Sequence, residues 1–289
     1  MGSLLKIELK KAFSNKMFLI SMAIGIIIAM ISAGQNIANY CRGLEMNAMT
    51  EQLLEGEPFN PMYPINTVYS NWIGSDHQFP MTALFYMLLP LLAGLAYGWS
   101  YCTERKSGYV AQMVSRSTKK SQYFLAKYIA TFLAGGAAVA IPLVLNVLAV
   151  ACFIPAYFPK QFYWIYYTMD SHFLRELFFR APVVFVCCII LLDFVFAGLF
   201  AAACVALAFF VKNKFAVILL PFLGVLAVQY LQDNVLGTIT DFIAISPMDF
   251  LRGYAMNAVL GLPILIWLIL LLVFTLGVTW IKGAKDDVL

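Results

Sequence analysis

Charge is what this chain has least of. Asp, Glu, Lys and Arg make up 12% of its 289 residues, whereas hydrophobic residues make up 62%. Soluble domains usually carry about 25% charged residues. About six apolar runs are each long enough to cross a hydrocarbon core of about 30 Å as a helix. The composition excludes a water-soluble globular protein and predicts an all-α integral membrane protein, with residues 1–289 forming a single transmembrane domain.

Histidine is nearly absent, which removes most catalytic and metal-binding arrangements. His77 and His172 are the only two, and neither has a second histidine or a carboxylate at helical metal spacing. The sequence contains no HExxH, no GxSxG, no GxxxxGK[ST] and no CxxC pair among its six cysteines. We therefore expect no catalytic, cofactor-binding or metal-binding residues in this chain. If ATP drives the protein, another subunit must bind the ATP and its Mg²⁺.

Six apolar segments predict six transmembrane helices. They are residues 17–34, 82–103, 122–151, 183–211, 215–231 and 263–281. If the N-terminus is inside, 14 of the 19 basic residues lie in cytoplasmic segments. The five left outside are Arg42, Lys160, Arg175, Arg180 and Arg252. Because basic loops stay inside, this asymmetry predicts that both termini are cytoplasmic.

The leader, residues 3–16, predicts an amphipathic helix that lies on the membrane surface. Its apolar stripe recurs at helical spacing, at Leu5, Leu9, Ala12 and Phe13. The basic residues off this stripe are Lys6, Lys10 and Lys11. These lysines are the expected interfacial anchors, because they would lie among anionic head groups. A disordered basic leader is the alternative.

Two long segments are expected outside the cell. The first, residues 35–81, is acidic; its first half can continue the first helix until Gly56, and its second half is typical of a compact loop. The second, residues 152–182, is dense in aromatic residues, which favour the head-group region. An aromatic belt along the outer interface is the favoured interpretation, and a substrate-binding role is the alternative.

The stretch after the fifth span contains two apolar segments that meet at Ser246-Pro247. Residues 235–245 and 249–260 both predict helices, and each is too short to cross the membrane. A re-entrant hairpin fits this pattern if protein buries its backbone. An interfacial loop fits it equally well.

Asp193 is the one carboxylate inside an apolar run. A charge at the bilayer centre is costly and suggests a function by default. Counting about 20 residues back from Val211 at 1.5 Å each places Asp193 near the outer interface. A solvated or helix-bonded aspartate is therefore favoured over a proton relay.

The segment between the second and third spans is the most informative. Glu104 ends the second span, and an apolar patch at helical spacing follows, at Tyr109, Val110, Met113 and Val114. Arg116 and further basic residues then precede the third span. The pattern predicts a short amphipathic helix on the cytoplasmic face, either an interfacial turn or a docking surface for a soluble partner.

In these residues the chain resembles the membrane subunits of type-two ABC exporters. In that family the second span runs into an acidic residue and a glycine, followed by a coupling helix, an arginine and a lysine in the third span. Glu104, Gly108, Arg116 and Lys127 stand at those positions. The leader is similar to the family's connecting helix, and the Ser246-Pro247 region to its outer hairpin. The first outer segment is longer than is usual in the family.

The resemblance implies a permease subunit that exports an amphipathic substrate, such as an antimicrobial peptide, a lipid or a glycan. A separate ABC ATP-binding subunit would supply the energy, and a second permease copy or a paralogous permease would complete the pair. Membrane lipids are the other expected partners, and no nucleic acid is expected. The implied ATPase-coupling residues are Glu104, Gly108, Tyr109, Val110, Met113, Val114 and Arg116. A secondary transporter or channel without an ATPase, or a non-transporting accessory subunit, remains the alternative.

Overall fold

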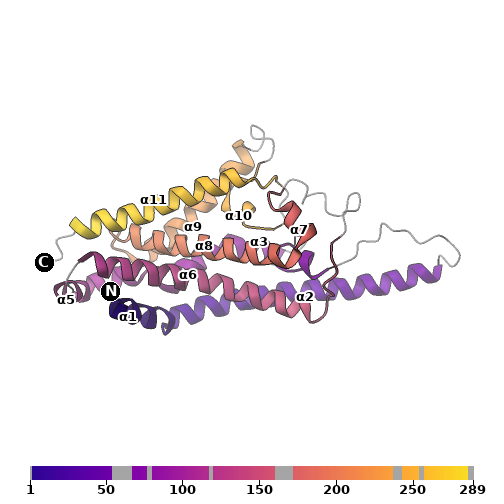
Figure 1. The fold of residues 1–289 in the computed structure, drawn as a ribbon, viewed down its shortest axis with the longest axis horizontal. Helices are drawn as coiled ribbons and strands as arrows, with labels where there is room; N and C mark the ends of the chain where they lie inside the picture. The colour runs from indigo at the N-terminus through magenta and orange to yellow at the C-terminus, as the bar shows by residue number, and fades with distance from the viewer. Residues whose placement is uncertain are drawn as a thin grey trace.

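The computed structural model describes residues 2–53, 67–76, 80–116, 120–159, 172–236, 243–253 and 257–285. Long helices run side by side through this part of the chain (Figure 1). The start of α1 (Gly2–Phe13) and the end of α11 (Gly261–Lys285) lie at one end of the bundle together with α5 (Tyr109–Arg116), and we call this the lysine-rich end. We call the opposite end the far end.

Among the described residues, six helical stretches are long and apolar enough to span a membrane, which confirms an all-α membrane fold. They are Lys16–Met46, Pro80–Lys106, Ser121–Ala151, Pro182–Leu207, Lys214–Leu236 and Gly261–Gly283. The helices that provide them are α2 (Lys16–Leu53), α3 (Pro80–Ala93) with η2 (Gly94–Gly98) and α4 (Ser100–Lys106), α6 (Lys120–Ala151), α8 (Pro182–Leu207), α9 (Lys214–Leu231) with η4 (Gln232–Leu236), and α11 (Gly261–Lys285).

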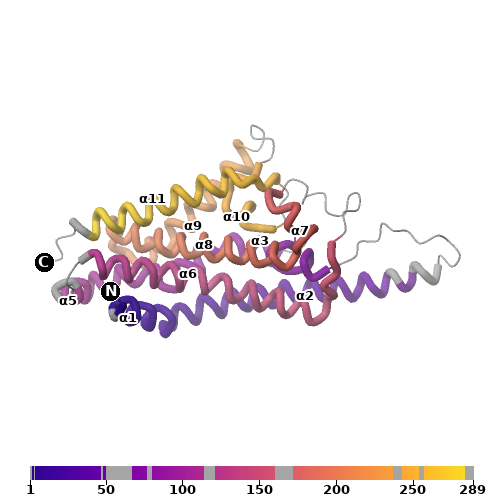
Figure 2. The backbone as a smooth tube through the Cα atoms, viewed as in Figure 1, coloured from indigo at the N-terminus to yellow at the C-terminus, as the bar shows by residue number. Residues whose placement is uncertain are grey.

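Shorter elements cover the two ends of the bundle. At the lysine-rich end these are α1 (Gly2–Phe13) and α5 (Tyr109–Arg116). At the far end they are η1 (Val68–Ser70), α7 (Arg175–Arg180) and α10 (Pro247–Phe250). Both α1 and α5 are helices where the sequence predicts them. Helix α2 runs past the other helices at the far end (Figure 2), as expected for a first span that continues outward.

The core centres on α6 and α8, which approach closely because two glycines face the partner helix. A Cβ added at Gly198 would lie 2.7 Å from the Phe132 ring, and one at Gly136 would lie 2.7 Å from the Phe194 ring. Those two rings meet edge to face with their centroids 5.9 Å apart. Interiors are close-packed, so a larger residue at either glycine would force the helices apart.

The two helices predicted at residues 235–245 and 249–260 are contradicted where the structure describes them, because residues 243–245, 251–253 and 257–260 are not helical. In the described parts of this region, the π-helical turn η4 ends at Leu236 and the only α-helix is the four-residue α10. The side-chain oxygen of Gln232 accepts hydrogen bonds from the backbone N–H groups of Ile245 and Ser246. Because a side chain satisfies these buried backbone groups, the segment does not need to be helical. Residues 237–242 and 254–256 lie outside the described residues.

Candidate functional site

A group of buried charged and phenolic side chains lies where α1, α4 and α6 meet at the lysine-rich end. We call it the junction cluster. Its members are Glu8, Lys11, Tyr97, Glu104, Tyr123 and Lys127. These residues come from three parts of the chain that are far apart in the sequence, namely α1, η2 with α4, and α6, and they pair their charges with one another.

Lys127 lies at the centre of the junction cluster and is fully buried. Its Nζ atom lies 2.8 Å from Oε2 of Glu104 and 3.1 Å from Oε2 of Glu8. The same ammonium donates to the hydroxyl of Tyr97 at 3.2 Å. An ammonium carries three N–H donors, and here each has an acceptor. An unpaired charge at this depth would cost several kcal/mol, so these contacts are what permit a lysine to be buried.

Lys11 lies on the surface side of the junction cluster and pairs with both of its carboxylates. Its Nζ atom lies 3.2 Å from Oε1 of Glu8 and 3.3 Å from Oε1 of Glu104. Two carboxylates therefore alternate with two ammonium groups, and their net charge is zero. The hydroxyl of Tyr97 donates to Glu8 at 3.0 Å, and that of Tyr123 donates to Glu104 at 2.7 Å. Charge-assisted bonds of this kind are roughly twice as strong as neutral ones.

Glu8 and Lys11 each stabilise the charged form of the other. Burial alone would raise the pKa of Glu8, but the neighbouring Lys127 and Lys11 outweigh it and hold the pKa below 4.5. Partial burial alone would lower the pKa of Lys11, yet contact with Tyr109 and the two carboxylates raises it instead. At neutral pH both groups are therefore ionised.

Helix α5 is fastened to the junction cluster at several points. The Nζ atom of Lys11 lies 3.7 Å from the centre of the Tyr109 ring. The side chain of Val110 is 1% exposed and packs in an apolar cluster with Tyr101, Tyr123 and Phe124, against which Met113 also packs. Tyr123 thus belongs both to this apolar cluster and to the junction cluster. A movement of α5 must therefore displace the ends of neighbouring helices.

Gly108 makes the turn between α4 and α5. Its φ angle is +72°, in the left-handed region that side chains with a Cβ rarely adopt. The preceding backbone closes the end of α4, with the Ser107 N–H donating to the Thr103 carbonyl at 3.0 Å. A glycine that ends a helix in this conformation is common. The turn therefore explains the glycine at this position without reference to any ligand.

The structure brings only some of the expected site residues together. Glu104 and Tyr109 lie at or beside the junction cluster, and Gly108 shapes the adjoining turn. The expectation that the apolar face of α5 stays exposed for a partner is wrong for Val110, because this face packs on the chain's own spans. Val114 and Arg116 lie within α5, but their side chains fall outside the described residues.

The predicted stripe and anchors of the leader need correction. Ala12 is fully buried as expected, but Phe13 is 39% exposed and Glu8 lies on the buried face. The reason is that α1 packs against α6, where Lys127 requires a carboxylate partner. Lys11 turns inward to the carboxylates and is not a free anchor. Lys6 and Lys10 are exposed, as an anchoring role requires.

Glu8, Tyr97 and Tyr123 belong to the site but were not predicted from the sequence. The available signal was that Glu8 is the one acidic residue in a leader with four lysines. Nothing comparable marked the tyrosines. Tyr97 lies in the π-helical turn η2, and π-helical turns occur often at functional sites.

Asp193, predicted to be solvated or helix-bonded, is fully buried and therefore not solvated, and its bonding partner lies on the neighbouring helix α3. Its Oδ2 atom accepts a hydrogen bond from the hydroxyl of Tyr86 at 3.1 Å. Its Oδ1 atom has no hydrogen-bond partner among the described residues. Arg252, from the segment that covers the far end, lies over the Tyr86 ring with 5.7 Å between the guanidinium carbon and the ring centre.

Within the described ranges, no group of three or more His, Cys, Asp and Glu side chains could hold a metal ion. No protein-family model matches the sequence, and no curated protein is significantly similar to it.

Proposed function

We propose that this chain is the permease subunit of an ATP-driven exporter of the type-two ABC class, powered by a separate ATP-binding subunit. The observation that supports it best is that Tyr109 of α5 lies against Lys11, which belongs to the ion pairs that join α1 to the second and third spans. A coupling helix has to transmit force, and ion pairs among α1, α4 and α6 give a rigid path for it. The residues that resemble the family's motif, Glu104 and Lys127, form the shortest ion pair in that path, at 2.8 Å.

Movement of a partner against α5 would then act on several spans at once. Val110 is buried in its apolar cluster, Tyr109 lies under the Lys11 ammonium, and Gly108 connects α5 to α4. A displacement of α5 would therefore shift α1 and the ends of α4 and α6 as a unit. Allosteric transitions commonly take this form, a rigid-body change between two packed states biased by a ligand.

The surface left for a partner is polar and basic. Exposed residues on and around the turn between α4 and α5 include Arg105, Lys106, Ser107 and Gln112. Because Val110 of α5 is already buried against the chain's own spans, the ATP-binding subunit would meet this basic surface, and charged residues on its rim would steer the encounter. We place this end of the bundle in the cytoplasm, in line with its lysines.

The exported substrate follows from the family resemblance alone. An amphipathic molecule is proposed, with an antimicrobial peptide as the first candidate and a lipid or glycan as the next. A second permease, identical or paralogous, would complete the transport unit. The membrane of a bacterial cell is the proposed location, with both termini in the cytoplasm.

The test is copurification of an ATPase from native membranes. Lys106→Glu should weaken the association and the stimulation of ATP hydrolysis, because it reverses a charge on the exposed turn. Lys10→Glu is the matched control, since it reverses an exposed lysine on α1 and should leave both unchanged. If no ATPase copurifies, and the purified chain transports on its own in vesicles, the chain is a secondary transporter or channel.

A second variant tests the coupling path itself. Gly108→Pro fixes φ near −65°, which is incompatible with the observed +72°. The chain should still insert into the membrane, but ATP hydrolysis should no longer drive transport. Unchanged coupling in Gly108→Pro would remove α5 from the mechanism.

A further inference from the structure

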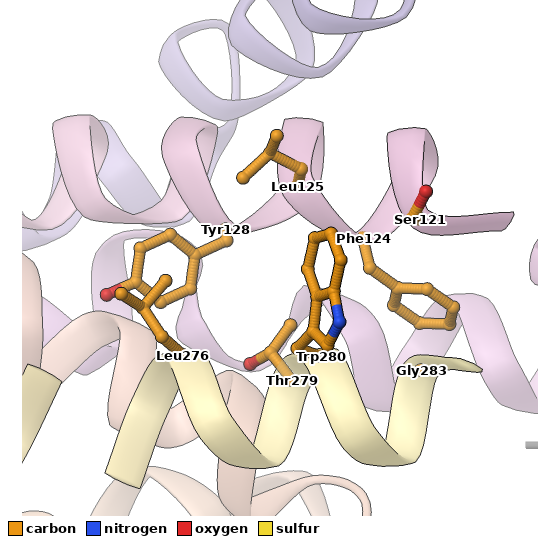
Figure 3. Close-up of a pocket in the computed structure, with 8 residues that line it drawn as sticks. All are labelled: Ser121, Phe124, Leu125, Tyr128, Leu276, Thr279, Trp280 and Gly283. Carbon is orange, nitrogen blue, oxygen red and sulfur yellow. The ribbon is translucent and has the colours of Figure 1, made fainter. Parts of the chain in front are cut away.

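A pocket of about 110 Å³ lies between two membrane-spanning helices near the lysine-rich end. Helix α6 forms one wall and α11 the other, and the side chains of both point into the space between them (Figure 3). The lining residues are Ser121, Phe124, Leu125, Tyr128, Leu276, Thr279, Trp280 and Gly283. We call this space the α6–α11 groove.

The two helices touch at both ends of the groove. At one end Gly283 lies against Phe124, so closely that an added Cβ would be 2.8 Å from that ring. At the other end the hydroxyls of Tyr128 and Thr275 are hydrogen-bonded at 3.0 Å. These contacts hold the walls apart at a set distance, so the groove is a built feature of the fold.

The chemistry of the groove suits a hydrocarbon chain. Its walls are leucine and aromatic side chains, and the hydroxyl of Thr279 is already used by the carbonyl of Thr275 at 2.6 Å. A dry apolar cavity of ~150 Å³ accepts a benzene-sized molecule, so 110 Å³ accepts a short stretch of an acyl chain. Trp280 is 63% exposed and stands at the rim, where an amphipathic ring is favoured at a membrane interface.

The position of the groove determines what can occupy it. Both walls belong to helices that cross the membrane, and α11 is among the least buried of them, so lipid is the surrounding solvent. Lys120 begins α6 one residue before Ser121, and the exposed Lys282 precedes Gly283. A lipid whose tail lies in the groove would therefore have its phosphate near the end of α11, where the exposed Lys282 lies.

We propose that the α6–α11 groove is a binding site for one membrane phospholipid, which inserts an acyl chain between the two helices. The lipid stabilises the contact of α11 with the bundle, because α11 has few other buried residues in its spanning part. This site is separate from the junction cluster and does not depend on the function proposed above.

Native mass spectrometry of the full chain in mild detergent, with phosphatidylglycerol as the probe, tests the proposal. The wild-type chain should retain one phospholipid through detergent washing. Leu125→Trp and Leu276→Trp each fill the groove from an opposite wall, and each should lower lipid retention about tenfold. The matched control is Leu270→Trp, an exposed position of α11 away from the groove, which should retain lipid as the wild type does.

Thermal unfolding in detergent identifies any variant that fails to fold. If one filling variant fails to fold, lipid retention by the other tests the proposal. Retention that is equal in the filling variants and the control overturns the proposal. So does a filling variant that converts a dimer into a monomer without loss of lipid, because a second copy of the chain would then be the occupant.

Discussion

The two ends of the bundle bury polar groups by different means. At the lysine-rich end the junction cluster pairs full charges, with Lys127 between Glu8 and Glu104. At the far end the carboxylate of Asp249 accepts hydrogen bonds from the neutral side-chain amides of Gln232 and Asn257. Both arrangements satisfy buried groups, but only the first depends on a balance of opposite charges.

This difference decides how each end should respond to substitution. Removing one member of a buried ion pair leaves an uncompensated charge, which costs about 3–5 kcal/mol. Removing one neutral hydrogen-bond partner leaves an unsatisfied polar group, which costs about 1–3 kcal/mol. The lysine-rich end is therefore the more sensitive to the loss of a single side chain.

The largest effect is expected for Lys127→Met. It leaves the carboxylates of Glu8 and Glu104 with Lys11 alone, so the free energy of unfolding should fall by about 3–5 kcal/mol. Chemical unfolding in detergent, followed by circular dichroism, measures this change. Lys10→Met is the matched control, because that lysine is exposed on α1, and its effect should stay within about 0.5 kcal/mol.

The double variant Lys127→Met with Glu8→Gln sharpens the test. It restores the charge balance, so it should be less destabilised than the sum of the two single variants, and the cycle measures the coupling. Strictly additive effects would mean that the two side chains do not act as a pair.

The next effect is a pH dependence that comes from the far end. Burial lowers the pKa of His172 from 6.5 to about 4. The unfolded chain therefore binds a proton at a higher pH than the folded one, so stability is lost as the pH falls from about 6.5 to 4. The loss should approach about 3 kcal/mol at the acidic end of this range.

His172→Gln should abolish this dependence, because its amide oxygen can still accept from the Leu174 N–H but does not titrate. Glu8 acts in a different range. Its lowered pKa contributes stability that is complete above pH 4.5 and is lost as the pH falls further. A His172→Gln protein that still loses stability between pH 6.5 and 4.5 would assign the effect to another group.

A smaller effect is expected at Asp193. Asp193→Leu should lower the free energy of unfolding by about 1–3 kcal/mol, because the buried hydroxyl of Tyr86 loses its acceptor. Asp193→Asn keeps an acceptor of the same shape and should change stability and transport little. Transport that collapses in Asp193→Asn, with expression intact, would favour a proton relay and the secondary-transporter alternative.

The substitution with the smallest expected effect on the structure tests which end of the bundle faces the cytoplasm. In a background without the exposed native cysteines, Ser107→Cys should react with an impermeant maleimide only after the cells are opened. Cys152, which is exposed at the far end, should react in intact cells when it is retained. Strong labelling of Ser107→Cys from outside would invert the proposed topology.

Much of the architecture could be predicted because it depends on local composition. The apolar runs predicted the six spans, and the short amphipathic pattern after Gly108 predicted α5. The predicted helices near Ser246 were wrong because their apolar pattern ignored the Gln232 side chain, which satisfies backbone groups 13 and 14 residues away in sequence. Side-chain contacts at that separation leave no periodic signal.

The sequence by itself determined that this is a helical membrane protein, because hydrophobic length and the scarcity of charge act along the chain. Only the tertiary structure decided which polar residues meet. Glu8 and Lys127 are 119 positions apart, and their pairing exists because α1 folds back on α6. Burial of Lys127 requires a neighbouring carboxylate but does not specify which one. That choice depends on how the helices pack.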